Sequence, residues 1–256
     1  MFSATDYDKL QQLMEESTEK QQLLTKLLTS HRMEISAISH EIRNPLTLVY
    51  STLQLIESQH PEVTYYEHWD EMHRDIEYMN ELLNDLSAYN NSDLLKLSPV
   101  DSNTFLKTVA LSFAASIVHT DIQFTSTIPP QLPSIYADAL KLRQLLLNLL
   151  TNAKDAVYPA PLNARIPSIF FEAFTEHQSL TIRVKDNGCG IPSDRLDHIF
   201  EPFVTHKQHG TGLGLAISAE IAKAHNGTLT VTSVPEASTV FTLTLPIQDN
   251  GKDKAG

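Results

Sequence analysis

Five of the eight glycines in this sequence fall in two clusters, at 188 and 190 and at 210, 212 and 214. Such clusters are typical of backbone that approaches a ligand closely or adopts positive φ. The second cluster, Gly210-Thr211-Gly212-Leu213-Gly214, leads into a predicted helix over 213–225. A glycine-rich helix start presents free N–H groups and the positive end of the helix dipole, which suits a phosphate. Because Gly-Lys-Ser/Thr is missing, the segment is not a Walker loop.

Polar side chains that suit the rest of a nucleotide lie nearby in the sequence. Asn148 and Asn152 are four residues apart on a leucine-rich predicted helix. Their amides can hydrogen-bond within a core, or an amide oxygen can ligate Mg²⁺ that is shared with phosphates. Asp186, just before Gly188, can accept a hydrogen bond from an exocyclic amine such as that of adenine, or can belong to a simple turn. Lys207 can neutralise phosphate charge or be a solvated lysine.

His40 is the candidate nucleophile. In the heptad pattern around it, Ile38 and Ile42 occupy seam positions, so His40 falls at the outermost position, on the same face as Asn44. An imidazole with a pKa of about 6.5 is mostly neutral at pH 7 and keeps a nitrogen lone pair for attack. A neighbouring carboxylate such as Glu41 can take the ring proton. On periodicity alone, an idle surface histidine is the alternative.

Two long helices must carry this histidine. The first hundred residues contain no glycine, and a heptad seam runs from residue 24 to residue 56, breaks at His60-Pro61-Glu62, and resumes from 69 to 86. Its members are Leu24, Leu28, His31, Ile35, Ile38, Ile42, Pro45, Val49, Thr52 and Ile56, then Trp69, Met72, Ile76, Met79, Leu83 and Leu86. The pattern predicts a helical hairpin with more apolar surface than its two helices can cover, and therefore a dimeric four-helix bundle.

The second half has a different pattern. Short β-rich runs are expected at 122–127, 169–174, 180–184, 228–233 and 240–245, with helices at 138–157, 193–200 and 213–225. The fold class predicted for the whole chain is α+β, a helical hairpin followed by an α/β sandwich with helices on one face of a sheet. The turn at 234–239 lacks the glycines expected there, which leaves its geometry in doubt.

Composition narrows the setting. The chain has 256 residues, 41% of them hydrophobic, and a net charge of −12, which disfavours a nucleic-acid partner. No apolar run approaches the roughly 20 residues of a membrane span, and the first residues do not read as a signal peptide. The single cysteine, Cys189, excludes an internal disulfide and is compatible with the cytoplasm, the location we expect.

Two sets of motifs resemble a known family. Residues 38–46, Ile-Ser-His-Glu-Ile-Arg-Asn-Pro-Leu, closely resemble the phosphoacceptor box of bacterial two-component sensor histidine kinases. The motifs at 148–156, 186–192, 199–207 and 210–215 resemble, in order, the N, G1, F and G2 boxes of the kinase's ATP-binding domain. That domain has the Bergerat fold shared with gyrase B, the heat-shock chaperone ATPases and MutL. The resemblance covers about residues 30–247.

The resemblance implies a role for each site residue. His40 would be phosphorylated from ATP, Glu41 would take its proton, and Asn44 would position water for a reverse phosphatase reaction. The nucleotide residues would share the remaining work: Asn152 would hold Mg²⁺, Asn148 would assist at the phosphates, Asp186 would read adenine, Gly188 and Gly190 would shape its pocket, Lys207 would face phosphate, and Gly210, Thr211, Gly212, Leu213 and Gly214 would form a lid hinge.

The resemblance also implies domains and partners. Residues 1–29 would be an input extension, 30–96 the dimerisation and phosphotransfer domain, 97–247 the ATP-binding domain and 248–256 a tail. The partners would be a second copy of the chain and the receiver domain of a response regulator. Because residues before 24 leave no room for a sensor domain, we expect the signal to enter through this N-terminal stretch, through a separate sensor or regulatory protein as a further partner, or through a segment absent from this sequence.

Two rival functions remain. One is a Bergerat-fold ATPase that forms no phosphohistidine, against which the box from His40 to Pro45 argues. The other is a dimeric scaffold or phosphatase whose ATP domain only regulates, against which the intact Asn152, Asp186 and glycine motifs argue.

Overall fold

The structure, a computed structural model, describes residues 18–158, 166–205, 207 and 210–247. The chain divides into two compact units, Met1–Asn91 and Ser92–Gly256. Each unit is considered by itself. Among the described residues, no helix is both long and apolar enough to cross a membrane.

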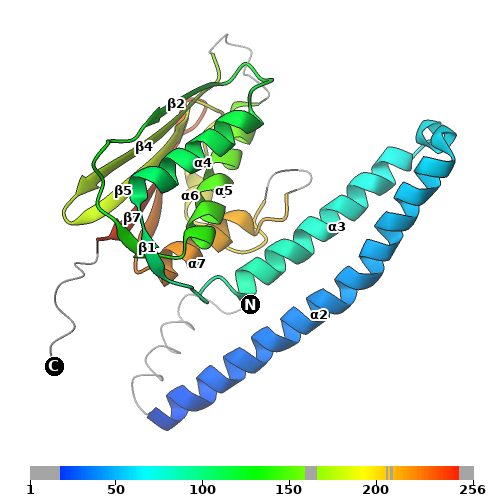
Figure 1. The fold of residues 1–256 in the computed structure, drawn as a ribbon, viewed down its shortest axis with the longest axis horizontal. Coiled ribbons are helices and arrows are strands. Elements are labelled where there is room, and N and C mark those ends of the chain that lie inside the picture. Colours follow the sequence, from blue (N-terminus) through cyan, green and yellow to red (C-terminus); the bar gives the residue numbers. More distant parts are fainter. Residues whose placement is uncertain (1–17, 159–165, 206, 208–209, 248–256) are drawn as a thin grey trace. The chain divides into compact units, whose positions relative to one another are not determined.

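The first unit is the predicted helical hairpin. Helix α2 spans Thr18–Gln59 and helix α3 spans Trp69–Asn90, and Figure 1 shows them side by side. A short 3₁₀ turn, η1 (Pro61–Tyr65), joins them where the heptad pattern breaks. Pro61 suits this position because the first residue of a helix needs no backbone N–H partner.

The surface of α2 that packs on α3 is not the predicted seam. Arg43 and Tyr50 hydrogen-bond to Asn84 and Glu77 of α3, and Ser39 and Leu53, on the same face of α2, are buried. The seam residues Ile38, Ile42 and Val49 are instead 56%, 49% and 48% exposed. The row that α3 covers is therefore displaced by one residue from the seam. Leu24 and Leu28 lie outside the described side chains.

Helix α3 shows the same division. Ile76 and Leu83 are buried as the heptad pattern predicts, but Met72 and Met79 are 38% and 42% exposed. A heptad pattern shows which rows of a helix are apolar but not which helix packs on each row. A row that packs on the other helix of the hairpin therefore has the same pattern as a row that packs on a second chain.

The second unit is a five-stranded sheet with helices on one face, as predicted (Figure 1). The strand order is β2-β4-β5-β7-β6, with β2 parallel to β4 and every other pair antiparallel. The strands are β2 (Gln123–Thr127), β4 (Ser168–Glu176), β5 (Ser179–Asp186), β6 (Thr228–Val234) and β7 (Ser238–Pro246). The helices are α4 (Ser102–Ser116), α5 (Ala139–Val157), α6 (Ser193–Leu196) and α7 (Gly214–Ala224).

Three elements were not predicted. Helix α4 begins at the N-cap Asp101, whose side chain accepts a hydrogen bond from the Thr104 N–H, and it buries Leu106 and Phe113. Strands β1 (Ser98–Val100) and β3 (Ile135–Ala137) pair with each other in a separate two-stranded sheet. Strands of three residues are too short to give a readable alternation.

Two predicted elements differ in detail. The helix expected over 193–200 ends at Leu196, and the chain continues in turns with hydrogen bonds between residues three apart, such as His198 N–H to the Arg195 carbonyl. The turn at 234–239 closes a regular hairpin without glycine, because Glu236 adopts a φ of 58°. A non-glycine residue in this region costs about 1 kcal/mol or more, which the paired strands offset.

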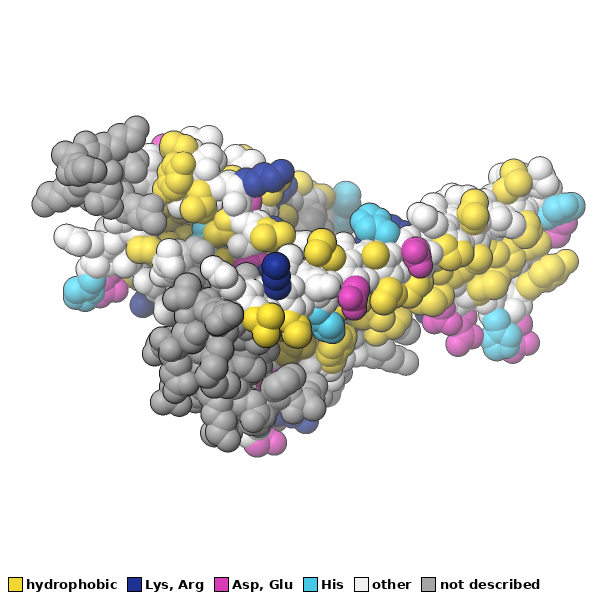
Figure 2. Space-filling view, turned by 90° about the horizontal axis from the view of Figure 1, so that it is seen from below, with side chains coloured by type: hydrophobic (Ala, Val, Ile, Leu, Met, Phe, Trp, Pro, Cys, Tyr) yellow, Lys and Arg dark blue, Asp and Glu magenta, His cyan; other side chains and the backbone are white. Residues whose placement is uncertain are grey.

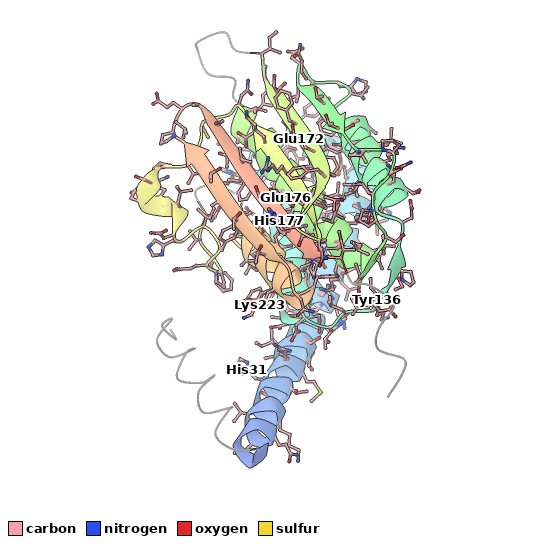
Figure 3. The ribbon with its side chains drawn as sticks, turned by 90° about the vertical axis from the view of Figure 1, so that its left-hand side faces the viewer. His31, Tyr136, Glu172, Glu176, His177 and Lys223 are labelled. Carbon is pink, nitrogen blue, oxygen red and sulfur yellow. The ribbon has the colours of Figure 1, made fainter. Side chains whose placement is uncertain are left out.

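The sheet has one covered face and one open face. Alternate residues of β7, including Phe241 and Leu243, are buried beneath the helices. Figure 3 looks onto the open face, where Glu172 of β4 lies. Because the strand residues alternate between the covered face and the open face, the polar motifs lie outside the strands, on α5 and in the loop after β5.

Candidate functional site

Asn148 joins the helix with the two asparagines to the helix that follows the second glycine cluster. Its amide Nδ2 donates to the Ser218 Oγ of α7 at 2.8 Å, and the Ser218 hydroxyl donates in turn to the Gly214 carbonyl at 2.9 Å. A Cβ built on Gly214 would lie 2.5 Å from the Asn148 Oδ1, so only glycine lets α7 begin this close to α5. Asn148 thus holds the predicted phosphate loop beside α5.

Asn152 and Asp155, one turn further along α5, together hold a lysine. The Lys207 Nζ donates to the Asn152 Oδ1 at 2.8 Å and to the Asp155 Oδ2 at 2.6 Å. Asn152 is half-buried, whereas the side chains of Asp155 and Lys207 are 43% and 47% exposed. Both oxygens belong to the donor types that Mg²⁺ prefers, and both bind a cationic group here. The residues therefore fit the implied metal.

Asp186 ends β5 and is 2% exposed. Its carboxylate accepts hydrogen bonds from the backbone N–H groups of Gly188, at 2.8 Å, and Thr239. Burial outweighs these two bonds and raises the pKa of the Asp186 carboxyl to about 6. A carboxylate has about four acceptor positions, so Asp186 keeps capacity for a further donor such as a purine amine.

The loop after Asp186 lies against the last turn of α5. The Cys189 N–H donates to the Ala156 carbonyl at 3.0 Å, and a Cβ on Gly188 would collide with that same carbonyl. Gly190, at a φ of +66°, follows in the same loop. Cys189, between these two glycines, is exposed.

The second glycine cluster forms the loop before α7. Leu213 is the N-cap residue of α7 and is fully buried, while its N–H donates to the Thr211 Oγ1 at 3.3 Å. The Gly212 carbonyl accepts a hydrogen bond from the Phe203 N–H at 2.9 Å, which joins the motif at 199–207 to this loop. The Phe203 side chain is 59% exposed.

The tertiary structure therefore gathers the predicted nucleotide residues around one helix. The asparagines lie on α5, Gly188 contacts its C-terminal turn, Gly214 contacts Asn148, and Lys207 reaches Asn152. The Gly210 N–H donates to the Lys207 carbonyl at 3.3 Å. A buried carboxylate, two amides and a glycine loop at a helix start can recognise a base at one end and phosphates at the other.

His40 lies exposed on α2, beside the buried Ser39. The Arg43 Nη1 is 3.4 Å from the His40 Nδ1, while Arg43 Nη2 donates across the hairpin to the Leu83 carbonyl, the Asn84 Oδ1 and the Ser87 Oγ at 3.1–3.4 Å. Because a guanidinium only donates, Nδ1 is the acceptor in this contact. Glu41 and Asn44 are exposed, and no hydrogen bond joins either to His40, all three being described residues.

Sequence reasoning missed three residues at these positions. Asp155 lies in the motif at 148–156, and its three-residue spacing from Asn152 was the signal that could have indicated a shared contact. Ser218 lies four residues after Gly214 and offered the same kind of signal. Arg43 acts across the hairpin, on partners more than 40 residues away for two of its three bonds, and no local pattern indicated that.

Comparison with known proteins identifies each unit. Residues 137–249 match the profile of the histidine kinase-, DNA gyrase B- and HSP90-like ATPases, and residues 30–94 match that of the His Kinase A phospho-acceptor domain. The second unit is thus an ATP-binding domain of this class. In this order on one chain, the two domains identify a member of the two-component sensor histidine kinase family.

Individual relatives agree. The chain is 31% identical over 217 residues to the signal transduction histidine-protein kinase AtoS of Escherichia coli, which covers 85% of this chain and 35% of AtoS. It is 31% identical to the sensor histidine kinase ZraS of the same organism, over 98% of this chain and 52% of ZraS. The chain spans between about a third and a half of the length of these two curated relatives.

Solved structures share the fold. The full-length kinase ShkA in complex with AMPPNP superposes with a TM-score of 0.70 at 26% identity, covering 84% of this chain and 45% of that one. The catalytic domain of the histidine kinase ThkA superposes with a TM-score of 0.52 at 26% identity, covering 59% of this chain and 95% of that domain.

Proposed function

We propose that this chain is a protein-histidine kinase that transfers the γ-phosphoryl group of ATP to His40 and then to an aspartate of a response regulator. Two features of one chain support this most. His40 is exposed within the motif at 38–46, and the second unit brings Asn152, Asp186 and the loop from Gly210 to Gly214 together at one site. Each half alone fits other functions, but only a phosphotransferase needs both.

In the ATP domain, Asp186 would accept the adenine amine, and the loop through Gly188 and Gly190 would lie along the base. The loop from Gly210 to Gly214, with Thr211 and Leu213, would present backbone N–H groups to the phosphates. Asn152, with Asn148 beside it, would hold Mg²⁺, whose charge offsets that of the transferring phosphoryl group. Lys207 would add positive charge at the same phosphates.

At the hairpin, a ring nitrogen of His40 would bond to the γ-phosphorus as the bond to the ADP oxygen breaks, and ADP would leave with the electron pair. Glu41 would take the ring proton. The phosphoryl group would then pass to a carboxylate oxygen of the receiver domain. Asn44 would position water when the reaction runs as a phosphatase of that partner.

A homodimer is the assembly we propose, because the exposed row of the hairpin requires a cover. Ile38, Ile42 and Val49 on α2 and Met72 and Met79 on α3 are all at least 38% exposed. Figure 2 shows hydrophobic side chains in a band along the hairpin. Paired with a second copy, this row would form the four-helix stem on which the regulator docks.

We also propose the domain division 1–29, 30–96, 97–247 and 248–256, with the input arriving through the first segment, a separate sensor protein or a segment absent from this sequence. The phosphoryl donor, ATP, and the acceptor, a receiver domain, are both found in the cytoplasm, so we propose that the two units work there.

Autophosphorylation with γ-labelled ATP and Mg²⁺ tests this function. We expect an acid-labile, alkali-stable label that His40→Gln abolishes and that His31→Gln, an exposed histidine of the same helix, leaves intact. Asn152→Ala should also abolish it. ATP turnover that survives in His40→Gln without any label would establish the simple ATPase instead. Nucleotide binding without label or turnover, and a cellular output unaffected by Asn152→Ala, would establish the scaffold.

A further inference from the structure

The ammonium group of Lys207 occupies the oxygen atoms that a divalent cation would use. Its two partners on α5 are the Asn152 Oδ1, at 2.8 Å, and the Asp155 Oδ2, at 2.6 Å. These partners lie 55 and 52 residues before Lys207 in the sequence, so the contact is a product of the tertiary fold.

A metal ion and the ammonium cannot share this position. Two unit positive charges 3.5 Å apart repel by roughly 5 kcal/mol at an effective dielectric constant of 20, and a divalent ion doubles that. The Asn152 oxygen therefore serves Lys207 or the metal, but not both at once.

The contact is also weak enough to exchange. Both charged side chains are nearly half exposed, and an exposed ion pair contributes at most about 1 kcal/mol. The four methylenes of lysine let the ammonium move by several ångström with no change in the backbone. A nucleotide phosphate offers a stronger partner for the released ammonium.

We propose that Asp155 is a positioning residue that, with Asn152, holds Lys207 in the nucleotide-free protein, and that nucleotide binding exchanges Lys207 from these oxygens to the phosphates. The vacated oxygens then receive the cation that accompanies the nucleotide. This inference rests on the proposed function, because it assumes an adenine nucleotide at the site. In the nucleotide-free protein, Asp155 acts through Lys207.

The test is a double-mutant cycle on the binding of the non-hydrolysable analogue AMPPNP to the full chain, measured by calorimetry in EDTA. Asp155→Asn removes the negative charge that helps to hold Lys207, and we expect it to raise metal-free affinity about fivefold. In the Lys207→Met background the same substitution should change affinity by less than about twofold, because there is no lysine to release.

Plain electrostatic repulsion gives a different result. If Asp155 only repels the phosphates, Asp155→Asn raises affinity equally in both backgrounds, and the proposal is overturned. It is also overturned if Asp155→Asn has no effect on the otherwise wild-type chain. The matched control is Lys154→Met, which removes the same charge from the neighbouring position of α5 and should leave the Asp155→Asn effect intact.

A second measurement follows the cation. With Mg²⁺ titrated into each AMPPNP complex, the Asp155→Asn chain should need several-fold more Mg²⁺ for half-maximal effect, since one of the two vacated oxygens then belongs to a neutral amide. An unchanged requirement refutes the exchange. Absence of AMPPNP binding in every variant would instead refute the proposed function, and this inference with it.

Discussion

The buried carboxylate of Asp186 lowers the free energy of unfolding when it is ionised. The carboxyl is 2% exposed at the end of β5, and its burial raises its pKa from an ordinary value of 3.8 to about 6. At pH 7 the folded protein must therefore ionise a group that its surroundings disfavour. Asp186→Asn keeps the shape of the side chain and removes the ionisation.

The magnitude follows from the two pKa values. Below pH 3.8 the carboxyl is protonated in both the folded and unfolded states, so it contributes no penalty. As the pH rises, the unfolded state ionises first, and the free energy of unfolding falls until the folded carboxyl ionises near pH 6. The full loss is about 3 kcal/mol, of which about 2 kcal/mol develops between pH 4.5 and 7.

Urea unfolding followed by circular dichroism at several pH values measures this effect. The difference in unfolding free energy, Asp186→Asn minus wild type, should grow by about 2 kcal/mol from pH 4.5 to pH 7, because all other titrating groups cancel. A difference that stays constant with pH would refute the assigned burial penalty. The same variant should weaken adenine nucleotide binding about tenfold at pH 7, since it loses a charge-assisted bond. Unaltered binding would remove Asp186 from the nucleotide site.

Three further perturbations test the packing. Burial lowers the pKa of His225, whose Nε2 accepts a hydrogen bond from the Asp138 N–H at 3.0 Å. The free energy of unfolding should therefore fall as the pH drops below about 6.5, by at most 1.4 kcal/mol per pH unit. This pH dependence should vanish in His225→Gln, and if it persists it belongs to another group. Gly188→Ala should destabilise the protein by about 1–3 kcal/mol in urea unfolding, because the new Cβ meets the α5 backbone; a neutral effect contradicts the close approach. Arg43→Ala should lower hairpin stability by about 1–2 kcal/mol, read by the fluorescence of the single tryptophan, Trp69, and Arg43→Lys should recover little of it; full recovery would mean that charge alone matters.

The local motifs could be read directly from the sequence. Histidine at 40, asparagine at 152 and glycine at 188 and 212 are residue types that few other roles require in that order, and the two family profiles match the segments that contain them. Long elements were also predicted, because α2, α3 and α5 each repeat their pattern over several turns. Strands β1 and β3 repeat theirs for only three residues and were missed.

Periodicity and composition are properties of neighbouring residues, so the amino-acid sequence was enough to show which faces of the helices are apolar and which residue types gather in motifs. The sequence could not show that the row through Ser39 faces α3 and that the row through Ile42 stays exposed, because that depends on how the two helices pack. Only the tertiary structure placed Lys207 on Asn152 and Asp155. Contacts between residues 50 positions apart depend on the path of the chain between them, and no local pattern encodes that path.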